Sequence, residues 1–103
     1  MPQPVKTHVT YRPKSGKEQE LLALIRKHGP ALESTGLIVG GPPLVYRARN
    51  VRTGQTCFIE IFSWRDEQAS NLAHQTPEVM AVWEPMTPIL EQLEINVIES
   101  LSA

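Results

Sequence analysis

The stretch that decides the fold is CFIEIFSWRDEQASNLAHQTPEVMAVW, residues 57–83. Up to Trp64 it reads as a β-strand. Asp66 is a suitable N-cap for a short helix expected over 66–74, and Thr76-Pro77 is a second helix start, with proline at the first helical position. Most of the aromatic side chains and one of the three histidines of the chain lie in this stretch. A pocket with chemistry is therefore expected here.

Outside this stretch, alternating apolar and polar residues predict strands, and apolar residues three or four apart predict helices. Ser15 and Glu18 predict a capping box ahead of a first helix, Gly29-Pro30 predicts a kink or an interruption in it, and Gly36 predicts its end. Residues 37–43, LIVGGPP, read as a loop. The expected strands are 5–12, 44–50, 56–64 and 95–101, and the first helix is expected over 16–35.

The order strand, helix, strand, strand, helix, strand predicts one α+β domain over residues 1–103. It is the ferredoxin-like split βαβ pattern, a four-stranded antiparallel sheet with helices on one face. The third strand is apolar on both of its faces, so both faces need cover. The helices cover one face, and a second copy of the chain is the simplest cover for the other. The sequence therefore predicts a homodimer that packs through its sheet faces.

Glu60 interrupts the apolar third strand and needs a partner if it is buried. A two-residue turn at Thr53-Gly54 would place Arg47 opposite Glu60, whereas a three-residue turn would place Arg47 beside Ile59. We favour the two-residue turn, because it gives Glu60 an ion pair. Charge reversal at Glu60 is then expected to destabilise the fold strongly.

Composition excludes several classes of function. Ten basic and eleven acidic residues give a net charge of −1, with no block of like charge that would indicate nucleic-acid binding. No apolar run is long enough to span a membrane. Cys57 is the single cysteine, so no internal disulfide forms, and without an apolar targeting segment the expected compartment is the cytoplasm. Neither metal-ligand spacing nor a phosphate-binding loop occurs, so no cofactor is expected.

At this point the sequence resembles the antibiotic biosynthesis monooxygenase-like family of the dimeric α–β barrel superfamily. The resemblance covers about residues 5–101, and its most specific part is Ile61 to Ala69, followed by His74, Thr76-Pro77 and Trp83. It implies a dimeric α–β barrel with a pocket between helices and sheet. Oxygenases of the family use dioxygen on phenols or quinols without metal or flavin. Haem-degrading relatives are a poor match, since Trp83 stands near the position of their iron-binding histidine.

The resemblance implies that this chain is a cofactor-independent monooxygenase acting on a small phenolic or quinol-like molecule. His74 matches the family histidine and is the expected catalytic base or orienting donor, because imidazole titrates near neutral pH. A helix-end role is the alternative for His74. The expected substrate-binding residues are Trp64, Trp83, Tyr46 and Phe62.

Two other functions remain open: a non-catalytic ligand-binding or structural homodimer of the same fold, and an isomerase that uses the same cleft. The other two histidines are given lesser roles. His8 lies on the polar face of the first strand, which favours an exposed or interface position. His28 lies on the apolar stripe of the first helix, which favours a structural role.

Overall fold

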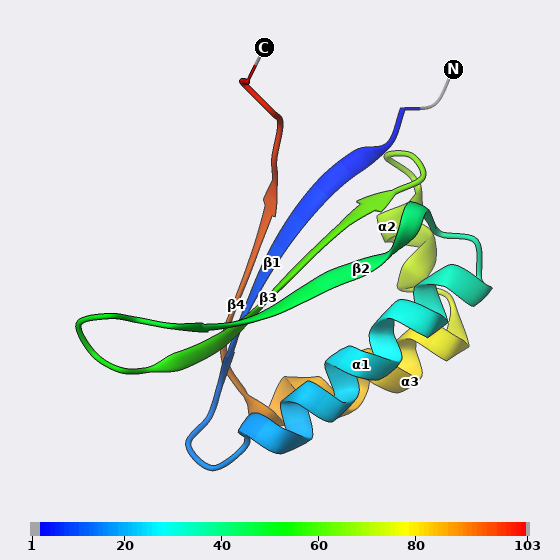
Figure 1. The fold of residues 1–103 in the computed structure, drawn as a ribbon. Helices are drawn as coiled ribbons and strands as arrows, with labels where there is room; N and C mark the ends of the chain where they lie inside the picture. Colours follow the sequence, from blue (N-terminus) through cyan, green and yellow to red (C-terminus); the bar gives the residue numbers. More distant parts are fainter. Residues whose placement is uncertain (1–2, 103) are drawn as a thin grey trace.

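The computed structural model describes residues 3–102 of the chain. Its elements, labelled in Figure 1, are β1 (Val5–Pro13), α1 (Glu18–Ser34), β2 (Ile38–Arg49), β3 (Thr56–Trp64), α2 (Ala69–Ala73), α3 (Pro77–Met86), the 3-10 helix η1 (Thr87–Ile89) and β4 (Leu90–Val97).

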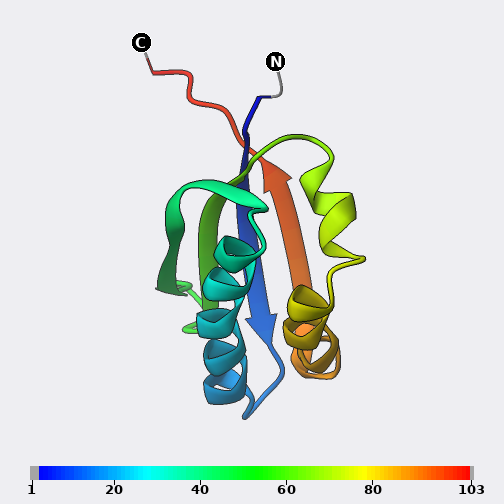
Figure 2. The same cartoon turned by 90° about the vertical axis from the view of Figure 1, so that its right-hand side faces the viewer.

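The four strands form one antiparallel sheet in the order β2-β3-β1-β4. All helices lie on one face of it, with α1 toward the β2 side and α2 and α3 toward the β4 side (Figures 1 and 2). The predicted ferredoxin-like fold is thereby confirmed. β1 and β3 are central, so their helix-facing side chains form the middle of the core.

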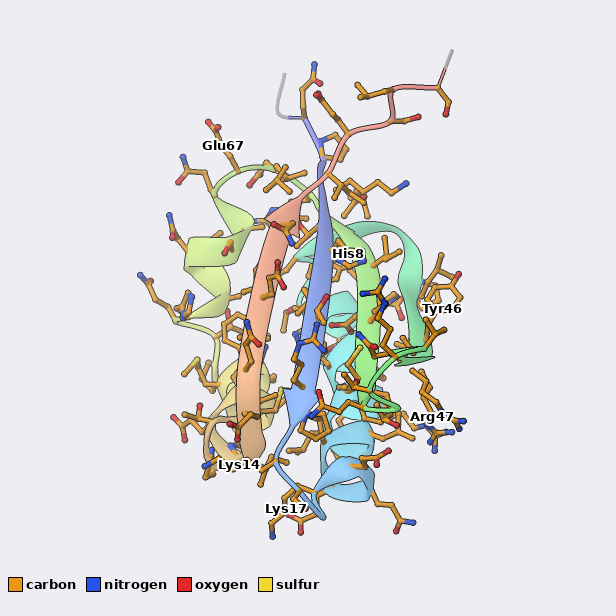
Figure 3. The ribbon with its side chains drawn as sticks, turned by 90° about the vertical axis from the view of Figure 1, so that its left-hand side faces the viewer. His8, Lys14, Lys17, Tyr46, Arg47 and Glu67 are labelled. Carbon is orange, nitrogen blue, oxygen red and sulfur yellow. The ribbon has the colours of Figure 1, made fainter. Side chains whose placement is uncertain are left out.

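Among residues 3–102, no helix covers the opposite face of the sheet, onto which Figure 3 looks. Ile59 and Ile61 of β3 point to this face, where their register partners on β2 are Tyr46 and Leu44. Leu44 is 56% exposed and Tyr46 is 51% exposed. The bare face thus presents four neighbouring apolar or aromatic side chains to solvent.

Helix α1 buries Leu21, Ile25 and Leu32, which share one stripe of the helix. The expected capping box at Ser15 is wrong: the N-cap is Lys17, which makes no side-chain capping hydrogen bond. Of the kink or interruption expected at Gly29-Pro30, the interruption is wrong, because the helix continues through Pro30.

The predicted end of α1 at Gly36 is confirmed. Gly36 has φ +70° and its N–H donates to Glu33 O, while the N–H of Leu37 donates to Leu32 O. This pair of bonds is a Schellman motif, which satisfies the last carbonyls of the helix and turns the chain toward the sheet.

β2 begins at Ile38, six residues before the predicted start at Leu44. The glycines at 40 and 41 have φ of +83° and +93°, and the register with β3 shifts between Val39 and Leu44. The expected loop is therefore an irregularity within a strand, possible because glycine adopts positive φ at no steric cost.

The β2–β3 hairpin does not use either turn expected from the sequence. Asn50 and Gln55 close a four-residue loop, and Asn50 Oδ1 accepts hydrogen bonds from the N–H groups of Arg52 and Thr53. The resulting register places Arg47 opposite Phe58 and Val45 opposite Glu60. The predicted ion pair between Arg47 and Glu60 is wrong, and the Arg47 guanidinium carbon lies 5.7 Å from the centroid of the Phe58 ring.

The region after β3 is predicted correctly in its order but not in its boundaries. Asp66 Oδ1 accepts from the N–H groups of Gln68 and Ala69, as expected of a cap, although α2 is shorter than predicted. α3 begins at Pro77 as predicted. The last strand occupies Leu90–Val97 and not 95–101. Its start is not evident in the sequence, because its first apolar residues continue the helical spacing of α3.

Candidate functional site

A cavity of about 320 Å³ lies between the β1–β4 side of the sheet and the helices α2 and α3. This volume is at the lower end of the range of small-molecule sites. Four of the five site residues expected from the sequence line it: Phe62, Trp64, His74 and Trp83. Tyr46 does not, since it points to the bare face of the sheet (Figure 3). Substrate binding at Tyr46 therefore has no support from this cavity.

The aromatic side chains that line the cavity pack against one another in edge-to-face contacts. Phe62 and Trp64 have ring centroids 5.0 Å apart at an interplanar angle of 82°, and both are buried. His74 and Trp83 have centroids 4.9 Å apart at 61°. His74 itself is exposed, at the C-cap of the short helix α2. The cavity therefore combines fixed aromatic walls with a solvent-accessible imidazole at its edge.

A series of buried hydrogen bonds, which was not predicted from the sequence, runs along another part of the cavity wall. The Tyr11 hydroxyl donates to Glu60 Oε1 at 2.6 Å. His28 Nδ1 lies 2.9 Å from Glu60 Oε1 and 3.0 Å from Oε2. The Trp83 indole N–H donates to His28 Nε2 at 2.8 Å. The series links β1, β3, α1 and α3, so it joins every layer of the core.

The donors in this series determine where its protons lie. An indole N–H can only donate, so His28 Nε2 must accept and carries no proton. The ring proton is then on Nδ1, which donates to Glu60. Because the Tyr11 hydroxyl also donates to Glu60, both neighbours of the carboxyl group are donors. The bonding pattern assigns an ionised Glu60 beside a neutral His28.

The sequence did contain a signal for this contact. Glu60 is 0% exposed and His28 is 2% exposed, and both occupy positions in otherwise apolar patterns. Each therefore needed a buried polar partner, and each could have been assigned the other. The sequence favours Arg47 as the partner only because it lies on the neighbouring strand.

Burial is the main cause that raises the pKa of the Tyr11 phenol well above its ordinary value. The negative charge of Glu60 and the hydrogen bond to it act in the same direction. Since the folded pKa is above the unfolded one, this phenol contributes stability that is fully present below about pH 10. That contribution is lost as the pH rises toward the folded pKa.

We therefore expect part of the tyrosinate absorbance signal to appear only as the protein unfolds in alkali. In a titration followed by ultraviolet absorbance and circular dichroism, this component should coincide with loss of structure and be missing from a Tyr11→Phe variant. A Tyr11 component that titrates while the circular dichroism is unchanged would contradict the buried bond to Glu60.

Within residues 3–102, no group of three or more His, Cys, Asp or Glu side chains is placed to hold a metal ion. None of the helices in the same part of the chain has both the length and the apolar character needed to cross a bilayer.

No protein-family model matches the chain, and no curated protein matches its sequence. Solved structures do match along almost its whole length. A protein from Arabidopsis thaliana aligns with a TM-score of 0.75 at 12% identity, covering 97% of this chain and 98% of that one. A variant of SnoaB, a cofactor-independent oxygenase from Streptomyces nogalater, aligns with a TM-score of 0.69 at 11% identity, covering 98% and 96%.

A further structure, of a protein named antibiotic biosynthesis monooxygenase, aligns with a TM-score of 0.72 at 13% identity, covering 95% of this chain and 99% of that one. The chain shares the fold of these structures. The resemblance drawn from the sequence is confirmed at this level. Identities of 11–13% establish the shared fold and leave the reaction to be argued from the site.

Within this fold, the site offers two chemically different regions. One is the exposed imidazole of His74, which can exchange a proton with a bound molecule and with solvent. The other is the buried series of hydrogen bonds from Tyr11 to Trp83, whose protons are all engaged. A ring held between Trp64 and Trp83 would lie next to both the His74 imidazole and these buried hydrogen bonds.

Proposed function

We propose that the protein is a cofactor-independent monooxygenase that acts on a small phenolic or quinol-like molecule. The observation that carries this proposal is the aromatic cavity of about 320 Å³ with the His74 imidazole on its wall. Phe62, Trp64 and Trp83 would enclose the ring of the substrate. His74 would take the proton of a hydroxyl group as general base. The similarity in fold to a cofactor-independent oxygenase supports the same reaction class.

The chemistry requires nothing beyond the substrate and dioxygen. Once His74 has removed the hydroxyl proton, the electron-rich anion is the reductant. For anthrone, the hydroxyl is that of its anthranol tautomer, whose proton comes from the ring methylene; this methylene carbon becomes a carbonyl and keeps one oxygen atom. The other oxygen atom leaves as water with the two hydrogens of the methylene. The protein needs only to ionise the substrate and to exclude water from the ring.

Oxygen uptake with anthrone as substrate tests this proposal directly. We expect one dioxygen to be consumed for each quinone formed, at a rate well above the spontaneous reaction in the same buffer. Heat-denatured protein serves as the control. A rate of oxygen uptake no higher than that control would contradict the proposed oxygenase activity. Binding of anthrone without oxygen uptake would favour the ligand-binding homodimer.

We further propose that the protein is a homodimer in which the bare sheet faces of two copies pack together. This proposal rests on Leu44, Tyr46, Ile59 and Ile61, which place apolar surface on the face that no helix covers. Burial of such a patch against its own copy removes it from water in an isologous interface.

Analytical ultracentrifugation should therefore give a mass close to twice that of the 11.5 kDa monomer. A Leu44→Asp variant should sediment as a monomer, because it would bury a carboxylate without a partner in the interface. The matched change Leu72→Asp lies on α2, at a position that is also exposed, and should leave the dimer intact. A monomeric wild-type protein at micromolar concentration would rule the interface out.

A further inference from the structure

The cavity wall formed by Thr7, Tyr11 and His28, here called the acceptor wall, has no hydrogen-bond donor to spare. All three residues line the cavity and are buried. The Tyr11 hydroxyl gives its proton to Glu60 at 2.6 Å, and the Thr7 hydroxyl gives its proton to the carbonyl of Val5 at 3.1 Å.

His28 contributes no free polar atom to the wall either. Its Nδ1–H donates to Glu60, and its Nε2 accepts from the Trp83 indole. This second bond also uses the indole N–H, which would otherwise be a donor on the adjoining surface. The protons of all four groups are therefore directed away from a bound molecule.

The hydroxyl oxygens of Thr7 and Tyr11 keep lone pairs that can accept a hydrogen bond from a ligand. A hydroxyl group that donates its single proton can still accept hydrogen bonds. Tyr11 is the stronger acceptor of the two hydroxyls, because its proton is held by an ionised carboxylate and charge-assisted hydrogen bonds polarise the donor. The same negative charge, buried behind the wall, repels an anion.

We propose that the acceptor wall binds a neutral hydroxyl or N–H group of the ligand, which donates its hydrogen to the Tyr11 oxygen. Quinones, ethers and carboxylates offer no such hydrogen and bind less well at this position. Glu60 acts here as a positioning residue, since it orients the Tyr11 proton without touching the ligand.

This inference deepens the proposed function by defining the substrate class. A hydroxyl that donates to Tyr11 keeps its proton, so it is not the group that His74 ionises. The preferred substrate is then an aromatic ring with two oxygen functions, as in a hydroquinone. One stays protonated at the acceptor wall and the other is ionised near α2.

Equilibrium binding of matched probes, without turnover, tests the acceptor wall. The probes are 1-naphthol and 1-methoxynaphthalene at neutral pH, with quenching of Trp64 and Trp83 fluorescence as the signal. The wild-type protein should bind 1-naphthol about tenfold more tightly, the size expected of one hydrogen bond in a buried site. A ratio of dissociation constants near one would overturn the inference.

The variant Tyr11→Phe removes the acceptor and should bring this ratio to about one. Tyr46→Phe makes the same chemical change on the opposite sheet face and should keep the wild-type ratio. If Tyr11→Phe also keeps the preference for 1-naphthol, the acceptor wall is not where the hydroxyl binds.

Glu60→Leu gives an independent second test. It removes the acceptor of the Tyr11 hydroxyl, which frees the phenolic proton to donate to the ligand. The ratio should then shift toward 1-methoxynaphthalene, and a ratio equal to that of the wild type would contradict the role of Glu60. Because oxygen uptake is not measured, a failure here leaves the proposed reaction standing, and absent oxygen uptake leaves the acceptor wall standing.

Discussion

A Glu60→Ala variant is expected to lose about 3–5 kcal/mol of unfolding free energy, because two buried donors are left without an acceptor and each costs about 1–3 kcal/mol. Glu60 is fully buried, and its loss would leave the Tyr11 hydroxyl and the His28 Nδ1–H without acceptors in the core. Glu60→Lys should be worse, because it adds a buried cation next to two donors. Total stabilities of 5–15 kcal/mol mean that the lysine variant should be largely unfolded.

Urea unfolding followed by circular dichroism measures both variants. Glu99→Lys, an exposed position outside all helices and strands, is the charge-reversal control and should change stability by less than about 0.5 kcal/mol. Near-native stability of Glu60→Lys would show that the carboxylate is not buried among donors.

A double-mutant cycle separates the hydrogen bond from the general cost of burial. Tyr11→Phe should cost about 1–3 kcal/mol in the wild-type background, where it leaves Glu60 with one donor fewer. In a Glu60→Leu background the same change should cost much less, because no acceptor remains to be satisfied. Equal costs in both backgrounds would mean that Tyr11 and Glu60 do not interact.

Strands with a clear apolar face could be predicted from the sequence, and elements that depend on distant contacts could not. β1 and β3 fall where expected, because each has an apolar face that must be buried. β4 is mostly exposed, so its sequence carries little period-two signal, and its leucines extend the helical spacing of α3. Its predicted start was therefore five residues too late.

The hairpin shows how one polar side chain can change a register. Thr53-Gly54 is a reasonable two-residue turn by local preference. In the structure, Asn50 accepts two backbone N–H groups and closes a longer loop, which moves Arg47 from Glu60 to Phe58. An asparagine that precedes the turn pair is the local signal that this prediction did not use.

The part of the site that is continuous in sequence was predicted, and the part that comes from distant residues was not. Phe62, Trp64, His74 and Trp83 come from one continuous stretch, and the structure gathers them around one cavity. Glu60 is 49 residues from Tyr11 and 32 residues from His28 in the sequence. The pairing of β1 with β3 brings Tyr11 to Glu60, and the packing of α1 on the sheet brings His28 to it. His28 was expected to be structural, yet it lies on the cavity wall as well as in the core.

A His74→Ala variant is expected to reduce kcat for oxygen uptake about 100-fold, the lower end of the range for loss of a general base. The imidazole lies at the cavity edge, against Trp83, and its loss removes the group proposed to ionise the substrate. Binding of 1-naphthol should change little, because the acceptor wall and the Phe62 and Trp64 walls remain. The comparison is between kcat in an oxygen electrode and Kd from fluorescence quenching.

The matched control is His8→Ala, a histidine of β1 that points to the bare sheet face and away from the cavity (Figure 3). It should keep the wild-type kcat. A general base also predicts recovery: added imidazole should restore part of the activity of His74→Ala in proportion to its concentration, because the missing side chain opens the cavity edge to it. A helix-end role of His74 predicts reduced stability and no recovery with imidazole, so these two measurements decide between proton transfer and capping.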